Sequence, residues 1–384
     1  MAATTRRIAC VEDLRRLAKK RVPRMFYDYV DGGSWTEQTY RENHSDFARI
    51  RLRQRVGVDV GHRSTSATML GQPIRMPVAI APTGLTGMTH ADGEILAARA
   101  AEKFGVPFTL STVSICSLED VAAHVEKPFW FQLYVMRDRD FVHGLMDRAA
   151  AVGCPTLVLT LDLQISGQRN KDIYNGLSSP PRPTLRNLAN LATKPRWCLA
   201  MLGTRRRTFG NLVGHVKGLD DTTSLAKWTN SQFDPTLDWD AVRRIRDRWP
   251  GRMVMKGILD PADAERAVEA GADAIVVSNH GGRQLDGALS SIAALPAVAA
   301  AVGSKTEVHL DGGILSGREV FKAVALGARS TYIGRSMLYG LGAMGEAGVA
   351  KVLELIRNEL DLTMALCGVR NVGEIGRESL VLPR

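Results

Sequence analysis

Short apolar runs recur along the chain from residue 77 onward, and each run ends in small or polar residues. Runs of this length that are rich in β-branched residues are typical of strands buried on both faces, as in a parallel sheet. We therefore expect strands at eight places. They are 77–84, 107–112, 129–135, 156–162, 252–257, 274–281, 307–313 and 330–335.

Stretches with helical spacing of apolar residues separate most of these strands. They are 92–104, 117–125, 139–152, 239–249, 261–270 and 317–326. Gly271 and Gly327 follow the last two directly, as expected where a helix ends. Eight strand-then-helix units predict an α/β fold of the (β/α)8 (TIM) barrel type. An open, doubly wound sheet is the alternative, but it would carry a GxGxxG turn after its first strand, and APTGLTG is not one.

The first 76 residues have a different pattern. Helical periodicity at 11–22 predicts a helix that Pro23 ends, and a second short helix follows as far as Asp31-Gly32-Gly33. Residues 34–76 are polar and irregular, except that an Arg-rich alternation at 49–55 favours a peripheral strand. We therefore expect one domain over residues 1–384, with an N-terminal helical cap at 1–76 and the barrel at 77–384.

The gap between the fourth and fifth predicted strands is unusually long. About ninety residues lie between Asp162 and Arg252, far more than the few that usually join a strand to its helix. We expect an insertion after strand 4 at about 170–235, on the active-site face, because long barrel insertions usually form lids or partner surfaces there. Its middle, 180–215, is rich in proline, arginine and aromatic residues.

The composition indicates a soluble globular enzyme, with 45% hydrophobic and 23% charged residues. The net charge of +10 favours anionic partners such as a charged cofactor, carboxylates, nucleic acid or acidic lipid. A nucleic-acid-binding module has little support beyond this charge and Arg205–Arg207, since no motif or stacking platform accompanies them.

The five cysteines are scattered and form no CxxC pair, which fits a reducing cytosol and argues against a disulfide framework or a metal site. The N-terminus has no apolar core of a secretory signal, and no apolar run reaches the roughly 18–20 residues of a membrane span. Any contact with a membrane is therefore expected at its surface.

The segment AIVVSNHGGRQLD at 274–286 carries the strongest functional signal. A buried strand that ends in histidine, two glycines and arginine holds a base and a cation at the rim of a barrel, where the active site of this fold lies. His280 and Asp162 could form a base and the carboxylate that orients it. Arg283 suits a planar substrate carboxylate.

The seventh and eighth strands end in glycine together with Asp311 or Arg335. This pair of loops commonly holds phosphate in barrels, and we expect the helix that starts at Gly317 to add its dipole. The remaining histidines are expected to be ordinary core or surface residues. They are His44, His62, His90, His124, His143, His215 and His309.

SNHGGRQLDG, together with FQLYV, LTLD followed by GQR, MKG, LDGG and YIGR, resembles the family of FMN-dependent α-hydroxy acid oxidases and dehydrogenases. The family includes glycolate oxidase, lactate and mandelate dehydrogenases, and the flavin domain of flavocytochrome b2. The resemblance runs from about Tyr27 to the final helix. It implies a (β/α)8 barrel that binds FMN and oxidises an L-2-hydroxy acid to the 2-oxo acid.

The resemblance also implies roles for individual residues. His280 is the base, Asp162 supports it, and Tyr134 bonds near the substrate hydroxyl. Arg283, Arg169 and Tyr29 face the substrate carboxylate, and Lys256 stabilises negative charge on the flavin. The isoalloxazine contacts are Pro82, Thr83, Gly84, Ser111, Gln132, Thr160 and Ser278. The ribityl and phosphate contacts are Asp311, Gly312, Gly313, Gly334 and Arg335. One departure is Leu315, because the family usually reads DGGxR and this chain reads DGGIL.

Within the family the chain is more similar to bacterial membrane-associated lactate and mandelate dehydrogenases. WCLAML, flanked by Lys194, Arg196 and Arg205–Arg207, resembles their membrane-contacting segment, so contact with the inner membrane through 180–215 is expected. The resemblance then implies L-lactate as substrate, a quinone or a cytochrome as electron acceptor, a homotetramer, and a place in the cytoplasm or on the cytoplasmic face of the inner membrane. Val113 leaves room for lactate or a larger acid.

Two alternatives remain open among flavin enzymes. One is a soluble 2-hydroxy acid oxidase that uses oxygen and releases peroxide. The other is a non-redox flavin isomerase on the same barrel, which would need no histidine and arginine directed at a carboxylate.

Overall fold

Eight parallel strands form the centre of the molecule in a computed structural model that describes residues 8–177, 184–214 and 231–382. The strands are β4 (Val78–Ile80), β5 (Thr109–Ser111), β6 (Trp130–Tyr134), β7 (Thr156–Thr160), β8 (Arg252–Ile258), β9 (Ala274–Val277), β10 (Glu307–Asp311) and β11 (Ser330–Ile333). They pair in the order β4-β11-β10-β9-β8-β7-β6-β5, and a bridge between Ile80 and Phe108 brings the two ends together. The predicted (β/α)8 barrel is confirmed, and every predicted strand is present.

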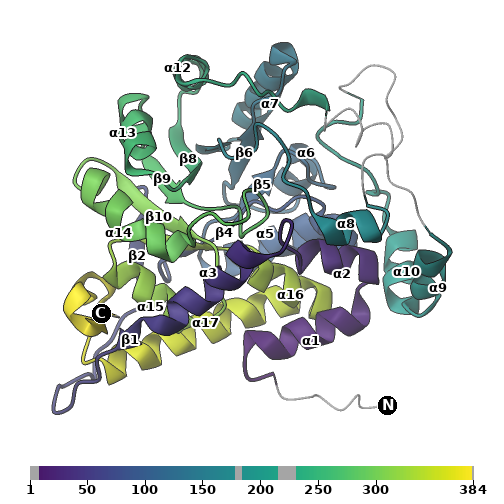
Figure 1. Cartoon of the computed structure of the whole chain (residues 1–384). Helices are drawn as coiled ribbons and strands as arrows, with labels where there is room; N and C mark the ends of the chain where they lie inside the picture. Colours follow the sequence, from purple (N-terminus) through teal and green to yellow (C-terminus); the bar gives the residue numbers. More distant parts are fainter. Residues whose placement is uncertain (1–7, 178–183, 215–230, 383–384) are drawn as a thin grey trace.

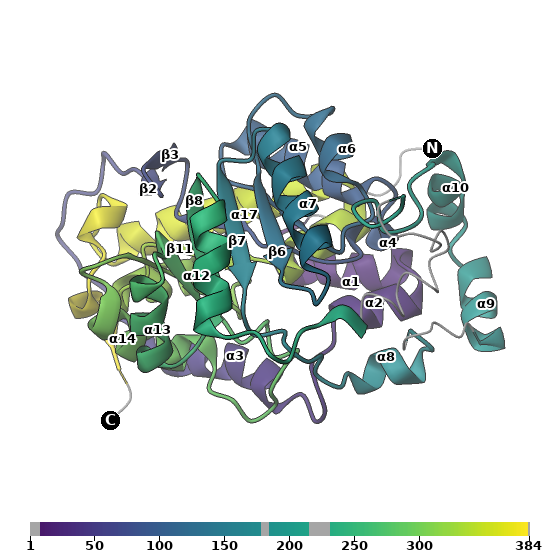
Figure 2. The same cartoon turned by 90° about the horizontal axis from the view of Figure 1, so that it is seen from above.

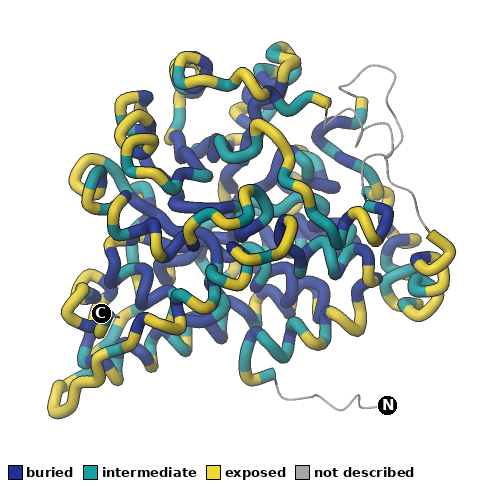
Figure 3. The backbone as a smooth tube through the Cα atoms, viewed as in Figure 1, coloured by how far each residue is buried: buried dark blue, intermediate teal, exposed yellow. Residues whose placement is uncertain are grey.

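Helices surround the barrel (Figures 1 and 2). Those that follow its strands are α5 (Gly93–Phe104), α6 (Leu118–Ala122), α7 (Arg139–Ala151), α12 (Trp239–Arg248), α13 (Pro261–Glu269), α14 (Ser291–Val302), α15 (Gly317–Ala325) and α16 (Arg335–Met344). A 21-residue helix, α17 (Glu346–Leu366), packs along α15, α16 and α5. Figure 3 shows the strands and the inner helix faces buried. Because a parallel barrel is covered on its outside by helices, its strands carry apolar residues on both faces, as the sequence pattern indicated.

The helix α14 was not predicted, for a physical reason. Its sequence, SIAALPAVAAAV, is almost entirely apolar and contains Pro296, so it has little of the amphipathic contrast that marks a surface helix. Ser290 nevertheless caps its start by accepting a hydrogen bond from the backbone N–H of Ala293.

The N-terminal region confirms two expectations and corrects one. Helices α1 (Val11–Arg21) and α2 (Arg24–Val30) lie where they were predicted, and β1 (Arg51–Leu52) pairs with β12 (Leu380–Val381) as the peripheral strand. Residues 34–76 are not simply irregular, because they contain the helix α3 (Gln38–Arg49) and the hairpin β2–β3 (Ala67–Met69, Gln72–Ile74). The buried stripe of α3 is Thr39, Asn43 and Phe47, which is too polar for hydrophobic periodicity to reveal.

The predicted insertion after the fourth strand is partly described. It contains α8 (Asn170–Tyr174), α9 (Leu185–Ala192) and α10 (Pro195–Gly203), and α9 and α10 project from the side of the barrel in Figures 1 and 2. Residues 178–183 and 215–230, which include parts of the predicted insertion and membrane segment and His215, lie outside the described residues. Within the described part of the chain, no helix is long and apolar enough to cross a membrane.

Candidate active site

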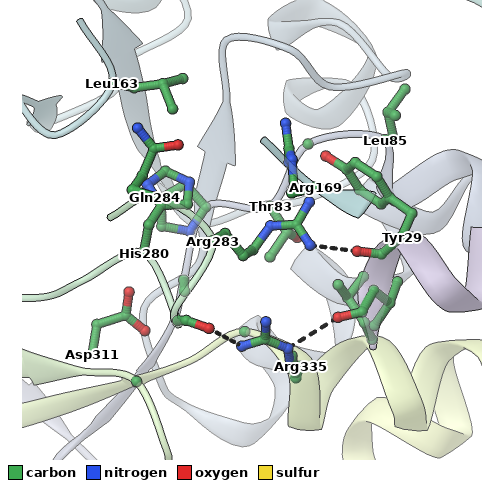
Figure 4. Close-up of a pocket in the computed structure, with 18 of the residues that line it drawn as sticks. Tyr29, Thr83, Leu85, Leu163, Arg169, His280, Arg283, Gln284, Asp311 and Arg335 are labelled. Atoms are coloured by element: carbon green, nitrogen blue, oxygen red, sulfur yellow. Dashed lines mark hydrogen bonds between the residues drawn. The ribbon is translucent and has the colours of Figure 1, made fainter. Parts of the chain in front are cut away.

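A pocket of about 240 Å³ opens at the carboxyl ends of the strands (Figure 4). Its wall combines strand ends with α2, α3, α16 and the loop after β7. Many of the predicted site residues meet there, although they come from distant parts of the sequence. They are Tyr29, Pro82, Thr83, Gly84, Tyr134, Arg169, Lys256, His280, Arg283, Asp311, Gly312, Gly313, Gly334 and Arg335.

The imidazole of His280 is oriented by Asp162. Nδ1 of His280 lies 3.0 Å from Oδ1 and 3.3 Å from Oδ2 of this carboxylate. Burial lowers the pKa of His280 although the negative charge of Asp162 opposes the shift. Burial favours the neutral form of Asp162, but its hydrogen bond to His280 and the positive charge of Lys256 outweigh burial and lower the pKa of Asp162. At neutral pH the pair therefore holds a neutral imidazole against an ionised carboxylate, with Nε2 able to accept a proton from a molecule in the pocket.

The backbone that carries His280 is unusual. His280 has a φ of 57°, and the two glycines that follow have φ values of 67° and 73°. A non-glycine residue in this left-handed region is strained, and such strain concentrates at functional sites. A side chain on Gly282 would meet the backbone nitrogen of Tyr40 at 2.5 Å. The glycines thus let the loop turn sharply and pack against α3 while His280 faces the pocket.

Arg283 presents a buried cation to the same pocket. Its Nη1 donates to the carbonyl oxygens of Tyr29 and Gly32, and its guanidinium stacks over the Tyr29 ring at 4.5 Å (Figure 4). Nη2 is buried and has no hydrogen-bond partner among the described residues. Burial, followed by the positive charge of Arg169, lowers the pKa of Arg283 to about 10. A buried guanidinium with an unused donor is a binding position for a carboxylate.

Arg169 and Tyr134 complete this side of the pocket. Arg169 lies 3.3 Å from Asp172 through its Nε, and its guanidinium carbon is 5.6 Å from the centre of the Tyr29 ring. Tyr134 packs edge-on against Phe233 with ring centres 5.7 Å apart. Burial and the negative charge of Asp162 raise the pKa of Tyr134, so its hydroxyl stays protonated and able to donate.

Lys256 forms a buried charge pair with Asp311. Its Nζ lies 2.9 Å from Oδ2 of Asp311 and 3.1 Å from the hydroxyl of Ser278, which in turn donates to the same carboxylate at 3.0 Å. Burial opposes the charge on Lys256, but the attraction of Asp311 and Asp162 outweighs it and raises the pKa of Lys256. The ammonium group is therefore a fixed positive charge in the floor of the pocket.

The opposite end of the pocket is rich in glycine. Gly312, Gly313 and Gly334 line it, and α16 begins at the next residue, Arg335, so the N-terminus of this helix faces the pocket. The sequence prediction that the helix at Gly317 supplies this dipole is wrong. The backbone N–H of Gly317 donates to Glu359 at 3.0 Å, and a side chain on Gly317 would run into α17. α15 is thus packed against α17 and away from the pocket.

Five predicted residues are not among those that line the pocket. They are Ser111, Gln132, Thr160, Asp162 and Ser278. Ser111 donates to Oε1 of Gln132 at 3.1 Å, whereas Nε2 of Gln132 and the hydroxyl of Thr160 are buried without a partner among the described residues. Unsatisfied buried polar groups are costly, so these atoms indicate a ligand with its own polar edge.

Sequence reasoning missed several residues of the pocket. They include His44, Leu85, Phe209, Phe233 and Gln284. Phe209 and Phe233 belong to the long insertion, where no strand pattern shows which residues return to the barrel. His44 lies on α3, the helix whose polar buried stripe concealed it, and the histidine was expected to be an ordinary core or surface residue.

Comparisons with known proteins agree with the geometry. A family model described as "FMN-dependent dehydrogenase" matches residues 18–382. An L-lactate dehydrogenase of Caulobacter vibrioides is 47% identical over 378 residues, which cover 97% of each chain. One from Stenotrophomonas maltophilia is 46% identical over 379 residues, which cover 97% of this chain and 99% of the relative.

Solved structures are also similar. The crystal structure of the monotopic membrane protein (S)-mandelate dehydrogenase has a TM-score of 0.94 and 37% identity, and the match covers 98% of this chain and 100% of that one. A mandelate oxidase structure has a TM-score of 0.83 and 35% identity, with 98% of both chains covered.

Proposed function

Because the chain belongs to the family of FMN-dependent dehydrogenases, we propose that it oxidises an L-2-hydroxy acid, L-lactate first among them, to the 2-oxo acid. The observation that carries this proposal is the arrangement of His280, held by Asp162, beside the unused donor of Arg283 in one pocket. A base and a carboxylate-binding cation together recognise a hydroxyl group next to a carboxylate. L-lactate is proposed because relatives 46–47% identical over nearly the whole chain are named L-lactate dehydrogenases.

The residues present fit FMN. Gln132 and Thr160 offer buried polar atoms without partners among the described residues, and Lys256 offers a fixed positive charge. At the other end, glycines and the N-terminus of α16 suit a phosphate. The isoalloxazine would be held by Pro82, Thr83, Gly84, Ser111, Gln132, Thr160, Lys256 and Ser278. The ribityl chain and phosphate would be held by Asp311, Gly312, Gly313, Gly334 and Arg335.

The chain positions the substrate and moves one proton. Arg283 and Arg169 hold the carboxylate, with Tyr29 beside them, and Tyr134 donates a hydrogen bond near the hydroxyl. Nε2 of His280 then accepts the hydroxyl proton, and Asp162 stabilises the imidazolium that forms. FMN, when bound, would accept the substrate's second hydrogen, the one on Cα, together with the two electrons that the substrate loses. Lys256 would stabilise negative charge on the flavin, because its ammonium group is already fixed in the floor of the pocket.

Anaerobic mixing tests the proposal. The purified protein should be yellow, and L-lactate should bleach its flavin absorption, whereas D-lactate should leave it unchanged. A panel of L-2-hydroxy acids of increasing size then measures the room beside Val113, Leu85 and Phe209. A protein that stays colourless after addition of FMN would overturn the proposal. Rapid peroxide formation in air would assign the oxidase reaction in place of electron transfer to a quinone or a cytochrome.

We also propose that α9 and α10 lie on a membrane surface. In α9 the buried residue is polar, and two of the leucines are exposed. Asn187 is buried and donates to the carbonyl of Asn175, whereas Leu185 is 86% and Leu188 is 55% exposed. In α10, Leu199 and Leu202 are 69% and 70% exposed. An exposed apolar patch of this kind marks an interaction surface.

The surroundings of these leucines favour lipid as the partner. Trp197 anchors α10 to the barrel by donating to the carbonyl of Met88 at 3.0 Å and stacking on Phe26, which fixes the leucines on the outside. Arg186, Arg196 and Arg205 are exposed on the same two helices or just after them, and cations beside an apolar patch favour anionic lipid. The similar (S)-mandelate dehydrogenase is a monotopic membrane protein.

The membrane face, the electron acceptor and the oligomeric state are also proposals. We place the patch on the cytoplasmic face of the inner membrane, where a quinone or a cytochrome could accept the electrons. The homotetramer stays a prediction, and light scattering of the detergent-solubilised protein would test it.

A further inference from the structure

His44 occupies the glycine-rich end of the pocket. It lies on α3, and its ring packs edge-on against Tyr40 at 5.4 Å. The same turn of α3 packs against the loops after β9 and β10: Asn43 hydrogen-bonds Asn279 at 2.9 Å, and Phe47 would be 3.0 Å from a side chain on Gly313. His44 is therefore held next to Gly312 and Gly313 by the close packing of its helix.

Few side chains can supply positive charge at this end. Arg335 is one, but its guanidinium donates to the carbonyl oxygens of Val30, Gly281 and Gly32 at 3.0, 2.8 and 2.6 Å. It also stacks over Tyr40 at 4.6 Å, so it is fixed by the protein itself. Ile314, Leu315 and Leu338 make the neighbouring wall apolar. Among the described residues that line this end, His44 is the other group that can become a cation.

We propose that His44 binds the terminal phosphate of FMN as an imidazolium, next to Arg335, where Leu315 contributes no charge. This inference rests on the proposed function, because it takes FMN as the ligand. It concerns a residue of this chain that the sequence motifs do not include.

The charged groups around His44 explain why we expect His44 to take up a proton when the phosphate of FMN binds. Burial and the guanidinium groups of Arg335 and Arg15 lower the pKa of His44 to about 4. Asp31 and the carbonyl of Gly313 oppose this shift, and Asp31 itself is bound to Arg15 and Tyr339. His44 is thus neutral at pH 7 when no anion is near. A phosphate dianion beside the imidazole opposes this shift and raises the pKa of His44, so FMN binding is coupled to proton uptake.

Comparison of FMN with riboflavin, which lacks the phosphate, isolates this interaction. The flavin is removed from the full-length protein, and each flavin is titrated back while its fluorescence is followed. We expect His44→Gln to weaken FMN binding about tenfold to a hundredfold, the effect of losing one hydrogen bond to a charged group. Riboflavin binding should not change. His62→Gln, at an exposed histidine, is the matched control and should change neither affinity.

Calorimetry in two buffers of different ionisation enthalpy gives the proton count. At pH 6.5 we expect the wild-type protein to take up more protons per FMN than per riboflavin, and His44→Gln to lose this difference, because a neighbouring opposite charge raises a pKa by about 1–3 units. Adding Leu315→Arg to His44→Gln should restore FMN affinity, because residue 315 lines the same wall and an arginine there replaces the lost charge.

Three results would overturn the inference. They are an unchanged FMN affinity in His44→Gln, an equal loss for FMN and riboflavin, which would indicate a structural role, and FMN binding by the wild type without proton uptake. Failure of the wild-type protein to bind either flavin would instead overturn the proposed function and with it this inference.

Discussion

Nδ1 of His280 lies 3.0 Å from Oδ1 of Asp162, although the two residues are 118 positions apart in the sequence. Gly257 makes room for this contact. It sits at an irregularity in the pairing of β8 with β9 and has a φ of 102°. A side chain there would lie 2.6 Å from Cβ and Cγ of Asp162 and would displace the carboxylate. The contact between His280 and Asp162 thus depends on a bulge in β8, a strand that carries neither of these two residues.

Asp162→Asn should leave FMN bound but slow its reduction by L-lactate roughly 10²–10⁴-fold, the range in which a positioned base contributes. The amide keeps the shape of the side chain but removes the charge that stabilises the imidazolium. Anaerobic stopped-flow absorbance measures the rate. Asp263→Asn, on the exposed side of α13, is the control and should keep the wild-type rate. A normal rate in Asp162→Asn would show that another group orients His280.

The pH dependence of kcat/KM should follow His280. Its pKa is lowered, mainly by burial, so the neutral base persists below pH 6.5. We expect kcat/KM for L-lactate to stay constant from pH 8 to below 6.5 and to fall at lower pH, where His280 becomes protonated. The profile is measured with a soluble electron acceptor after confirming that the protein stays folded at each pH. An acidic limb centred above pH 7 would contradict a histidine in this environment.

Arg283→Met should impair binding of the substrate carboxylate. The guanidinium is buried and its Nη2 has no partner within the described residues, so a bound carboxylate satisfies it. Loss of a buried charged pair typically costs about 2–5 kcal/mol, which corresponds to a fall in kcat/KM of roughly 10²-fold or more. Steady-state kinetics give this value, and flavin content should remain normal. Arg283→Lys tests geometry, because a lysine cannot stack over Tyr29 in the same way.

The sequence predicted the barrel because buried strands and amphipathic helices each carry a clear periodicity. It predicted the reactive end of the pocket because His280 and Arg283 directly follow a strand, and such positions converge in a barrel. The glycine-rich end was less predictable. His44 reaches it from α3, whose buried Thr39 and Asn43 contact other polar groups and so show no apolar period.

The role of the two helix N-termini could not be read from the sequence either. Gly317 and Gly334 each precede or begin a helix after a strand, but only the long-range packing of α17 distinguishes them. The carboxylate of Glu359 occupies the N-terminus of α15, whereas the N-terminus of α16 remains at the pocket. The contact between Gly317 and Glu359, which are 42 positions apart, determines which helix N-terminus faces the pocket. The local sequence pattern does not indicate this contact.

The leucines of α10 should determine whether the protein sediments with membranes. Leu199 and Leu202 are about 70% exposed, and each buried leucine contributes about 1.5–3 kcal/mol in an apolar environment. The double substitution Leu199→Glu, Leu202→Glu removes this contribution and adds two negative charges beside anionic lipid, so binding to vesicles that contain phosphatidylglycerol should weaken about a hundredfold or more. Turnover with a soluble acceptor should stay near normal, because neither leucine lines the pocket. Leu366→Glu, which is 61% exposed at the end of α17, is the matched control and should still bind vesicles. If both variants bind vesicles as the wild type does, the exposed leucines of α10 serve another partner.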